Sequence, residues 1–180
     1  MYEEGCDPWL SVCSVNPVHG LGSRIYRMGM APKPGKKVAV IGGGPAGMRA
    51  AIIAAEQGHT VTLFEKSGEL GGQMRYADHF RFKWPMKNYK NWMLSQLERL
   101  GVDVRLNCRP SREDIASGGY DAVLAATGAR SRLPRGVEGL TDENGALKPD
   151  IWTPMSVIGR EKELGERVVV VGGAESGVEC

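Results

Sequence analysis

The sequence predicts an α/β fold with a central parallel sheet and helices on both faces, in three layers. Two observations carry this prediction. Short, wholly apolar runs such as Val38–Ile41 are typical of strands buried on both faces. Helical patterns separate these runs along the chain, and such alternation is typical of parallel sheets.

The strands are expected to follow one another from Lys37 onward. We expect them at 38–41, 60–64, 102–106, 120–126 and 168–171. The segments 120–126 and 168–171 are apolar enough to predict that both strands are buried.

Helical segments are expected at 45–57, at 86–100 and, briefly, from Ser111. Pro45 suits the first position of a helix, and Gly58 suits the left-handed position just after its end. Ser111 and Asp114 match the capping-box pattern loosely. Residues 67–85 are polar and contain glycines, which favours a loop.

Composition excludes several classes of protein. With 42% apolar and 24% charged residues among 180, the chain is an ordinary globular sequence. A net charge of +2 gives no reason to expect nucleic acid or a membrane surface as a partner. No apolar run approaches the roughly 18 residues of a membrane span, and no signal peptide is visible, so we expect a cytoplasmic protein.

The first motif that carries chemistry is the glycine turn after residue 41. Gly42 allows a tight turn, Gly44 leaves room for a pyrophosphate against bare backbone, and Gly47 lets the following helix pack closely on the strand. Glu65, at the end of the next strand, can accept hydrogen bonds from both ribose hydroxyls and would repel a 2′-phosphate.

The neighbours of these residues belong to the same candidate site. Pro45 and Ala46 form the first turn of the helix, whose free N–H groups favour phosphate, and Lys66 follows the acid. We therefore expect residues 37–66 to bind the ADP half of a dinucleotide in a Rossmann-like unit. The alternative is a structural strand–helix–strand unit with an incidental glycine turn.

A second, weaker glycine turn closes the sequence. Gly172 and Gly177 match the first and last glycines, but Ala174 stands in the middle position, where its methyl group would face the pyrophosphate. A strand and turn without a ligand is the alternative here. The residue that would choose between NAD and NADP lies beyond Cys180.

Two such turns, at Gly42 and Gly172, resemble those of the two-dinucleotide-binding-domain flavoproteins, which are glutathione-reductase-like. That resemblance implies FAD at the first turn and NAD(P)H at the second. The segment 69–73 looks like the family loop whose Gly72 and Gln73 approach the flavin side of FAD. The segment 125–129 looks like the strand end whose Thr127 and Gly128 contact the FAD pyrophosphate.

More narrowly, the chain resembles the C-terminal part of NADH:flavin oxidoreductases related to 2,4-dienoyl-CoA reductase and trimethylamine dehydrogenase. The matching pieces are residues 13–17, 70–74 and 100–107, with an aromatic and basic stretch up to Trp84. In that family an FMN barrel and a 4Fe–4S cluster precede this module, which holds FAD or sometimes ADP.

The resemblance makes Cys13 the last cysteine of such a cluster, and so a metal ligand only when the upstream cysteines are present. Cys6 stands closer to Cys13 than the third cluster cysteine usually does, and the first two have no counterpart here. We therefore expect no cluster on this chain alone. Without a redox cysteine pair, the sequence also departs from the disulfide reductases of the superfamily.

These observations predict three parts: an irregular lead-in at 1–36, an FAD-binding domain at 37–140, and a crossing linker with the first turn of an NAD(P)-binding domain at 141–180. The fold is then truncated at the start of the second dinucleotide unit, and an N-terminal FMN barrel is missing. The expected function is the FAD-binding portion of an NAD(P)H oxidoreductase with an unknown small-molecule acceptor. A non-catalytic ADP or FAD module and an inactive gene fragment are the alternatives, and no catalytic acid or base is evident.

Overall fold

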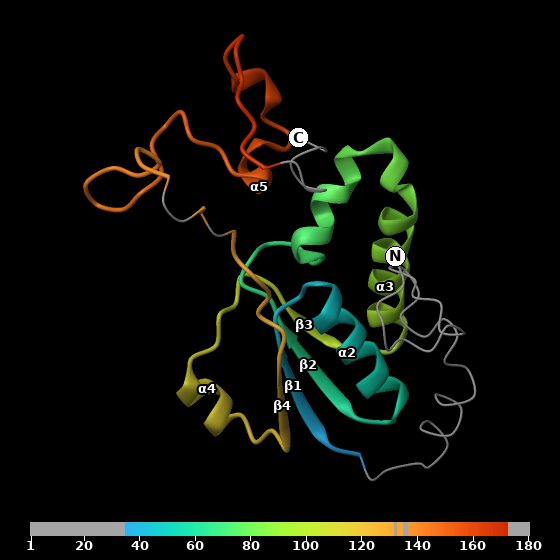
Figure 1. Cartoon of the computed structure of the whole chain (residues 1–180). Helices are drawn as coiled ribbons and strands as arrows, with labels where there is room; N and C mark the ends of the chain where they lie inside the picture. The colour runs from blue at the N-terminus through green and yellow to red at the C-terminus, as the bar shows by residue number, and fades with distance from the viewer. Residues whose placement is uncertain (1–34, 132, 135–136, 173–180) are drawn as a thin grey trace, which may run out of the picture. The chain divides into compact units, whose positions relative to one another are not determined.

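The computed structural model describes residues 35–131, 133–134 and 137–172, and it divides into two units between Gly128 and Ala129 (Figure 1). The first unit contains the sheet. The second contains short turns of helix and irregular chain.

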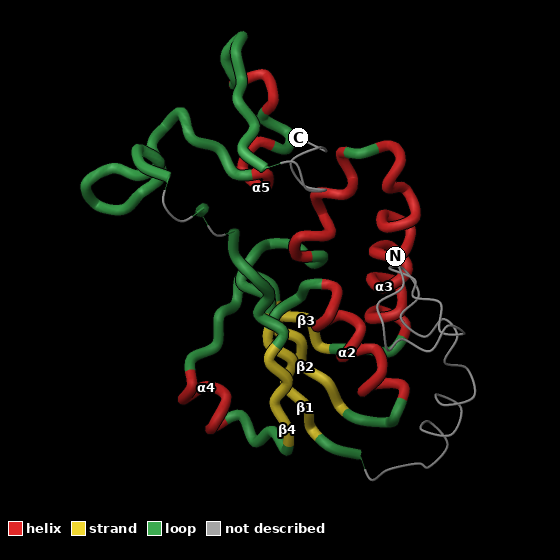
Figure 2. Tube along the Cα trace, in the orientation of Figure 1, coloured by secondary structure: helices red, strands yellow, loops and turns green. Residues whose placement is uncertain are grey.

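Four parallel strands form the sheet of the first unit, as the tube view shows (Figure 2). They are β1 (Lys37–Ile41), β2 (Thr60–Phe64), β3 (Asp103–Arg105) and β4 (Ala122–Ala125), in the order β3-β2-β1-β4. The α/β, Rossmann-like fold class predicted from the sequence is confirmed. Because β4 is added on the far side of β1, the strand order reverses at β1, and ligands of open α/β sheets bind at such a point.

Helices α2 (Pro45–Glu56) and α3 (Trp84–Arg99) lie on the same side of this sheet (Figure 1). The prediction for α2 is confirmed to within one residue, with Pro45 in the first turn and Gly58 left-handed at φ +85°. Apolar side chains of both helices meet the inward-facing residues of β1 and β2. The buried cluster includes Val40, Met48, Ile52, Leu63, Met93 and Leu97.

A short helix, α4 (Arg112–Ser117), precedes β4. Its start has a complete capping box, more regular than the loose sequence match suggested. The Asp114 amide donates to Ser111 Oγ (3.0 Å), and the Ser111 amide donates to Asp114 Oδ2 (2.8 Å). None of its residues is buried, so the box is the local reason that this segment is helical.

The prediction of a loop over 67–85 was wrong in part. Two 3₁₀ segments, η1 (Gly72–His79) and η2 (Arg81–Lys83), occupy much of it, and α3 begins two residues earlier than expected. Met74 and Ala77 are buried, so packing against α3 stabilises turns that the polar composition did not reveal.

The prediction that strand 120–126 is buried was also wrong. β4 pairs only with β1 among the described strands, and Val123 and Leu124 are 45% and 42% exposed. An edge strand has a neighbour on one side only, and α2 reaches little of it. An apolar run therefore does not by itself distinguish a central strand from an edge strand.

The second unit holds α5 (Pro154–Val157) and η3 (Glu161–Glu163), with an isolated bridge between Thr141 and Leu147. The predicted buried strand at 168–171 is not found: these four valines form no ladder and are 54–87% exposed. No strand in the described part of the chain pairs with them, and an apolar run without a partner strand is neither hydrogen-bonded nor covered.

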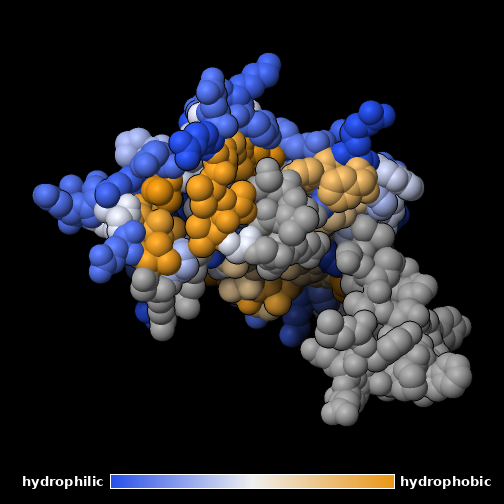
Figure 3. All heavy atoms as spheres, turned by 45° about the horizontal axis from the view of Figure 1, so that its top comes forward, coloured by the Kyte–Doolittle hydropathy of each residue, from blue (hydrophilic) through white to orange (hydrophobic). Residues whose placement is uncertain are grey.

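Apolar surface open to solvent is visible as orange regions in Figure 3, between blue polar residues. Within residues 35–131, 133–134 and 137–172, no helix is both long and apolar enough to cross a membrane.

Candidate dinucleotide-binding site

The first glycine turn is tied to strands on both of its sides. The Gly42 amide donates to the Phe64 carbonyl oxygen (2.8 Å), and the Ala126 amide donates to the Ile41 carbonyl oxygen (2.8 Å). Gly42 is left-handed at φ +111°, and a Cβ there would lie 2.2 Å from the Ala126 carbonyl oxygen. Only glycine fits both the backbone angle and the space.

Gly44 is the open position of the turn. Among the described residues, a Cβ on Gly44 would meet nothing nearer than the Gly72 Cα, at 3.9 Å. Gly44 also caps α2 without a side-chain hydrogen bond, so within the described part of the chain no capping side chain occupies the N–H groups of the first helical turn. Bare backbone and free N–H groups together suit an anion such as a pyrophosphate.

Glu65 is buried at the end of β2 and holds three hydrogen bonds. The Gly43 amide donates to Oε2 (2.6 Å), while the Ser67 amide (2.8 Å) and hydroxyl (2.7 Å) both donate to Oε1. Burial would raise the pKa of this carboxyl, but the hydrogen bonds from Ser67 and Gly43, with the charge of Lys66, outweigh it and lower the pKa. Glu65 is therefore a fixed anion beside the glycine turn, with acceptor capacity left on Oε2.

Ser67 was missed by the sequence reasoning. A hydroxyl residue two positions after an acid at a strand end is a usable signal, because a Ser side chain and amide readily bond a neighbouring carboxylate. The exposed Lys66 lies between the two and adds positive charge beside the carboxylate.

The predicted flavin loop lies against the first turn. The Gly71 amide donates to the Gly43 carbonyl oxygen (2.8 Å), and a Cβ on Gly72 would lie 2.8 Å from the Gly44 Cα. Two segments separated in sequence thus form one double loop. Gln73, the second residue of η1, is exposed.

Thr127 and Gly128 reach the same edge from β4. A Cβ on Gly42 would come within 3.3 Å of the Thr127 Cα. Gly128 is left-handed at φ +75°, and a Cβ there would meet no atom of the described residues within 4 Å. The carboxyl ends of β1, β2 and β4 therefore bring together the glycine turn, Glu65, the Gly72 loop and Thr127, which the sequence predicted separately.

Lys90 is a second residue that sequence reasoning missed. It is 9% exposed, lies on α3 and pairs with Asp78 of η1. The signal was present, because Lys90 stands at helical spacing between Met86 and Met93 in an otherwise apolar stripe.

The remaining predicted residues lie elsewhere. Gly172 belongs to the second unit, where it is exposed and left-handed at φ +109°. Ala174, Gly177 and the candidate metal ligand Cys13 lie outside the described residues. Among the residues that the structure describes, no cluster of His, Cys, Asp or Glu could hold a metal ion.

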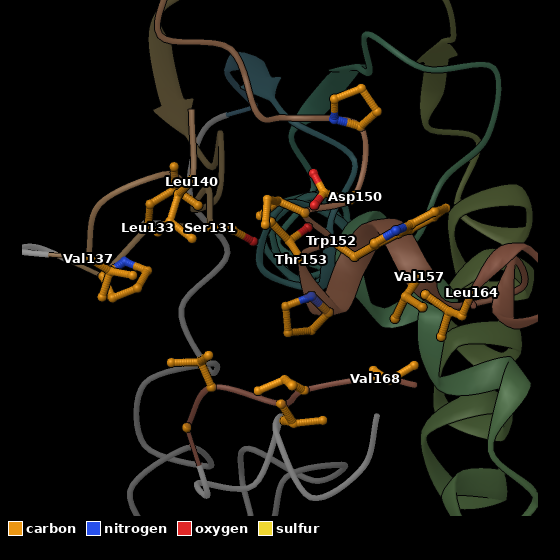
Figure 4. Close-up of a pocket in the computed structure, with 18 of the residues that line it drawn as sticks. Ser131, Leu133, Val137, Leu140, Asp150, Trp152, Thr153, Val157, Leu164 and Val168 are labelled. Atoms are coloured by element: carbon orange, nitrogen blue, oxygen red, sulfur yellow. The ribbon is translucent and has the colours of Figure 1, made fainter. Parts of the chain in front are cut away.

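The second unit contains a cavity of about 870 Å³ (Figure 4). Its lining is mostly apolar, with Trp152, Val157, Leu164 and Val168 among its residues and Asp150 as one of its few charges. The exposed valines 168–171 form part of this lining. The cavity is therefore open and apolar, and its lining suggests no specific ligand.

Comparison with known proteins identifies the family to which this geometry belongs. A family model described as pyridine nucleotide-disulphide oxidoreductase matches residues 36–180. An NADH oxidase of Thermoanaerobacter brockii is 40% identical over 168 residues, which is 93% of this chain and 25% of the relative. A cinnamate reductase of Clostridium sporogenes is 40% identical over 167 residues, 93% of this chain and 24% of the relative. The chain thus spans about a quarter of the length of these curated relatives.

Solved structures agree with the fold. A 2-naphthoyl-CoA reductase in complex with 2-naphthoyl-CoA is 31% identical with a TM-score of 0.60, over 68% of this chain and 19% of that one. A 6-hydroxypseudooxynicotine amine oxidase of Pseudomonas geniculata shares the fold at 24% identity and a TM-score of 0.65, over 81% of this chain and 23% of that one.

Proposed function

Because the chain belongs to the pyridine nucleotide-disulphide oxidoreductase family, we propose that it binds FAD at the edge formed by β1, β2 and β4. The family implies a flavin and NAD(P)H, and FAD is our specific assignment. The observation that carries it is the double loop. The open Gly44 backbone and the Glu65 carboxylate suit an ADP moiety, and the loop at Gly72 adds a surface that a longer ligand would reach.

In this proposal each residue has a binding role. Gly42 and Gly47 shape the turn, and Gly44, Pro45 and Ala46 present the start of α2 to the pyrophosphate. Glu65 accepts from the ribose hydroxyls and, as an anion, rejects a 2′-phosphate, with Lys66 beside it.

The flavin side of the ligand is assigned to the other segments. Gly72 and Gln73 lie toward the flavin half, while Thr127 and Gly128 close over the pyrophosphate from β4. A bound flavin would supply the hydride acceptor, and the protein would supply binding, orientation and electrostatics.

For the whole protein we propose an oxidoreductase that passes hydride from NAD(P)H through FAD to a small-molecule acceptor. Two of the relatives are an NADH oxidase and a cinnamate reductase, and these activities support this class. The turn at Gly172, with Ala174 and Gly177, is assigned to NAD(P)H. An FMN barrel and a 4Fe–4S cluster that uses Cys13 belong to the same proposal, as does a cytoplasmic location.

The deciding experiment is mass spectrometry of the small molecule released from the purified 180-residue chain, followed by titration with FAD and with ADP. We expect FAD to be released, and FAD to bind more tightly than ADP. A colourless protein that retains ADP and does not take up FAD would overturn the FAD assignment and favour a non-catalytic ADP-binding module.

The role of Glu65 is tested in the same titration with NADP as a competitor. We expect NADP to displace ADP much more weakly than NAD does, because the 2′-phosphate would approach a fixed carboxylate. Equal competition by the two would contradict the assignment of Glu65 to the ribose.

A further inference from the structure

Two ionisable side chains are buried in the part of the chain that the structure describes. Each lies against one segment of the double loop: the first loop, which contains Gly43, or the second loop, which contains Gly71. Glu65 (7% exposed) accepts from the Gly43 amide of the first loop. Lys90 (9% exposed) lies against Gly71 of the second loop. Burying a charge is costly, so a buried lysine calls for a structural or functional reason.

The stem of Lys90 fills the space beside Gly71. A Cβ on Gly71 would lie 3.0 Å from Lys90 Cδ, and Gly71 is left-handed at φ +115°. The ammonium group continues past the loop to the Asp78 carboxylate on η1. Lys90 therefore links helix α3 with the glycine loop and with the 3₁₀ segment η1, which begins within that loop.

Arg75 also contacts this loop, on the side of Gly71 where Lys90 lies. Its Nε donates to the Gly72 carbonyl oxygen (3.1 Å), and its guanidinium pairs with Glu69, which precedes the loop. A Cβ on Gly71 would lie 2.8 Å from Arg75 Cγ. The Gly72 carbonyl oxygen is thus held by a cation within its own segment, while the Gly71 amide is held by the first loop.

These contacts leave the loop little freedom to move relative to the first turn. We propose that Lys90, through its pairing with Asp78, is a positioning residue that holds Gly71–Gln73 against the Gly43–Gly44 turn for the flavin half of the cofactor. This inference rests on the proposed function. It separates two parts of the site: the first turn with Glu65 selects the ADP moiety, and the Lys90–Asp78 pair, with Arg75, makes the site selective for FAD over ADP.

The test compares the dissociation constants of FAD and ADP for the full chain and for the variant Lys90→Met, which keeps the length of the stem and removes the charge. We expect the FAD constant to rise about tenfold or more while the ADP constant changes by less than about twofold, because preorganisation of the loop benefits only the longer ligand. Asp78→Asn should shift the ratio in the same direction. Lys87→Met, the same change at an exposed position of α3, is the matched control and should leave both constants unchanged.

A purely structural pair would give a different result. If Lys90→Met weakens FAD and ADP equally, or changes neither, the positioning role is overturned. If the wild-type chain binds ADP and not FAD, the proposed function itself fails, and the two failures are distinguishable.

Lys90→Met alone leaves a carboxylate without its partner and could unfold the protein. The double variant Lys90→Met/Asp78→Asn removes both charges and so leaves neither unpaired. It allows the two dissociation constants to be measured even if the single variant does not fold. We expect it to melt near the wild-type temperature and still to lose selectivity for FAD. A folded double variant with the wild-type ratio of FAD to ADP affinity would overturn the proposal. The visible absorbance bands of bound FAD give a second readout, which should shift in every variant that loosens the loop.

Discussion

Gly47, in the first turn of α2, lies directly against Gly42 at the end of β1: a Cβ on Gly47 would be 1.8 Å from the Gly42 carbonyl oxygen. The same Cβ would lie 3.3 Å from the Ala126 side chain of the neighbouring strand end. No side chain can rotate away from this contact, because the obstacle is backbone. The start of α2 can therefore pack this closely against the sheet only because Gly42 and Gly47 carry no side chain.

Gly47→Ala should accordingly destabilise the fold. We expect the free energy of unfolding to fall by about 1–3 kcal/mol, because the added methyl group forces the start of α2 away from the turn. Urea unfolding followed by circular dichroism measures this. Unchanged stability would mean that the helix start can shift at no cost, contrary to the close packing described above.

Gly44→Ala should do the reverse, weakening binding and sparing the fold. Of the described atoms, its Cβ would meet only the Gly72 Cα, at 3.9 Å, so we expect the free energy of unfolding to change by less than about 0.5 kcal/mol. The methyl group would stand where the pyrophosphate approaches, and the FAD dissociation constant should rise about tenfold or more. Titration of FAD into this variant and into Gly47→Ala separates the two roles.

Glu65→Gln should change how stability depends on pH. The pKa of Glu65 is lowered in the folded protein, so its carboxylate adds stability that is fully present above its ordinary pKa of about 4.5. That stability is lost as the pH falls through the lower pKa of the folded state. The variant should therefore be less stable than wild type at pH 7, and the difference should shrink in acid.

Unfolding by urea at pH 7, 5, 4 and 3 measures this dependence. Ser67→Ala should weaken the effect without abolishing it, because the Gly43 and Ser67 amides still donate to the carboxylate. Glu98→Gln, a change at an exposed position of α3, is the control and should keep the wild-type profile. A Glu65→Gln profile parallel to that of wild type would show that the hydrogen bonds do not favour the ionised form.

Phe64→Ala should be strongly destabilising. Phe64 is 5% exposed and meets Tyr120 edge-on, with ring centroids 6.2 Å apart. The Arg105 guanidinium lies over the Phe64 ring, with its Cζ 5.4 Å from the ring centroid. We expect a loss of about 3 kcal/mol in the free energy of unfolding. Phe82→Ala, at a ring that is 67% exposed, is the matched control and should change it by less than about 0.5 kcal/mol. Similar losses for both would contradict the burial of Phe64.

Much of the first unit was predictable from the sequence because its signals are local. Pro45 and Gly58 mark the ends of α2 through backbone preferences that operate within a few residues. The same holds for Ser111 and Asp114 at α4. The glycines at 42–47 are required where backbone approaches backbone closely, and the acid at 65 stands at the end of the next strand. Both features can therefore be recognised directly from residue type.

Two of the errors arose where the outcome depends on which strand lies next to a segment in the sheet. The apolar segments 120–126 and 168–171 look alike in sequence. The first pairs with β1 as an exposed edge strand, and the second meets no strand within the described residues. Apolar composition indicates that a segment can form a strand, but it does not indicate which strands lie beside that segment.

The sequence alone therefore determined the α/β class, the glycine turn and the acid that follows it, since each rests on local geometry. The tertiary structure decided that the Gly71–Gly72 loop hydrogen-bonds to Gly43, that the Gly43 amide donates to Glu65, and that Lys90 is buried beside the loop with Asp78 as its partner. These contacts join residues from different elements, and only the folding of those elements onto one sheet edge brings them together.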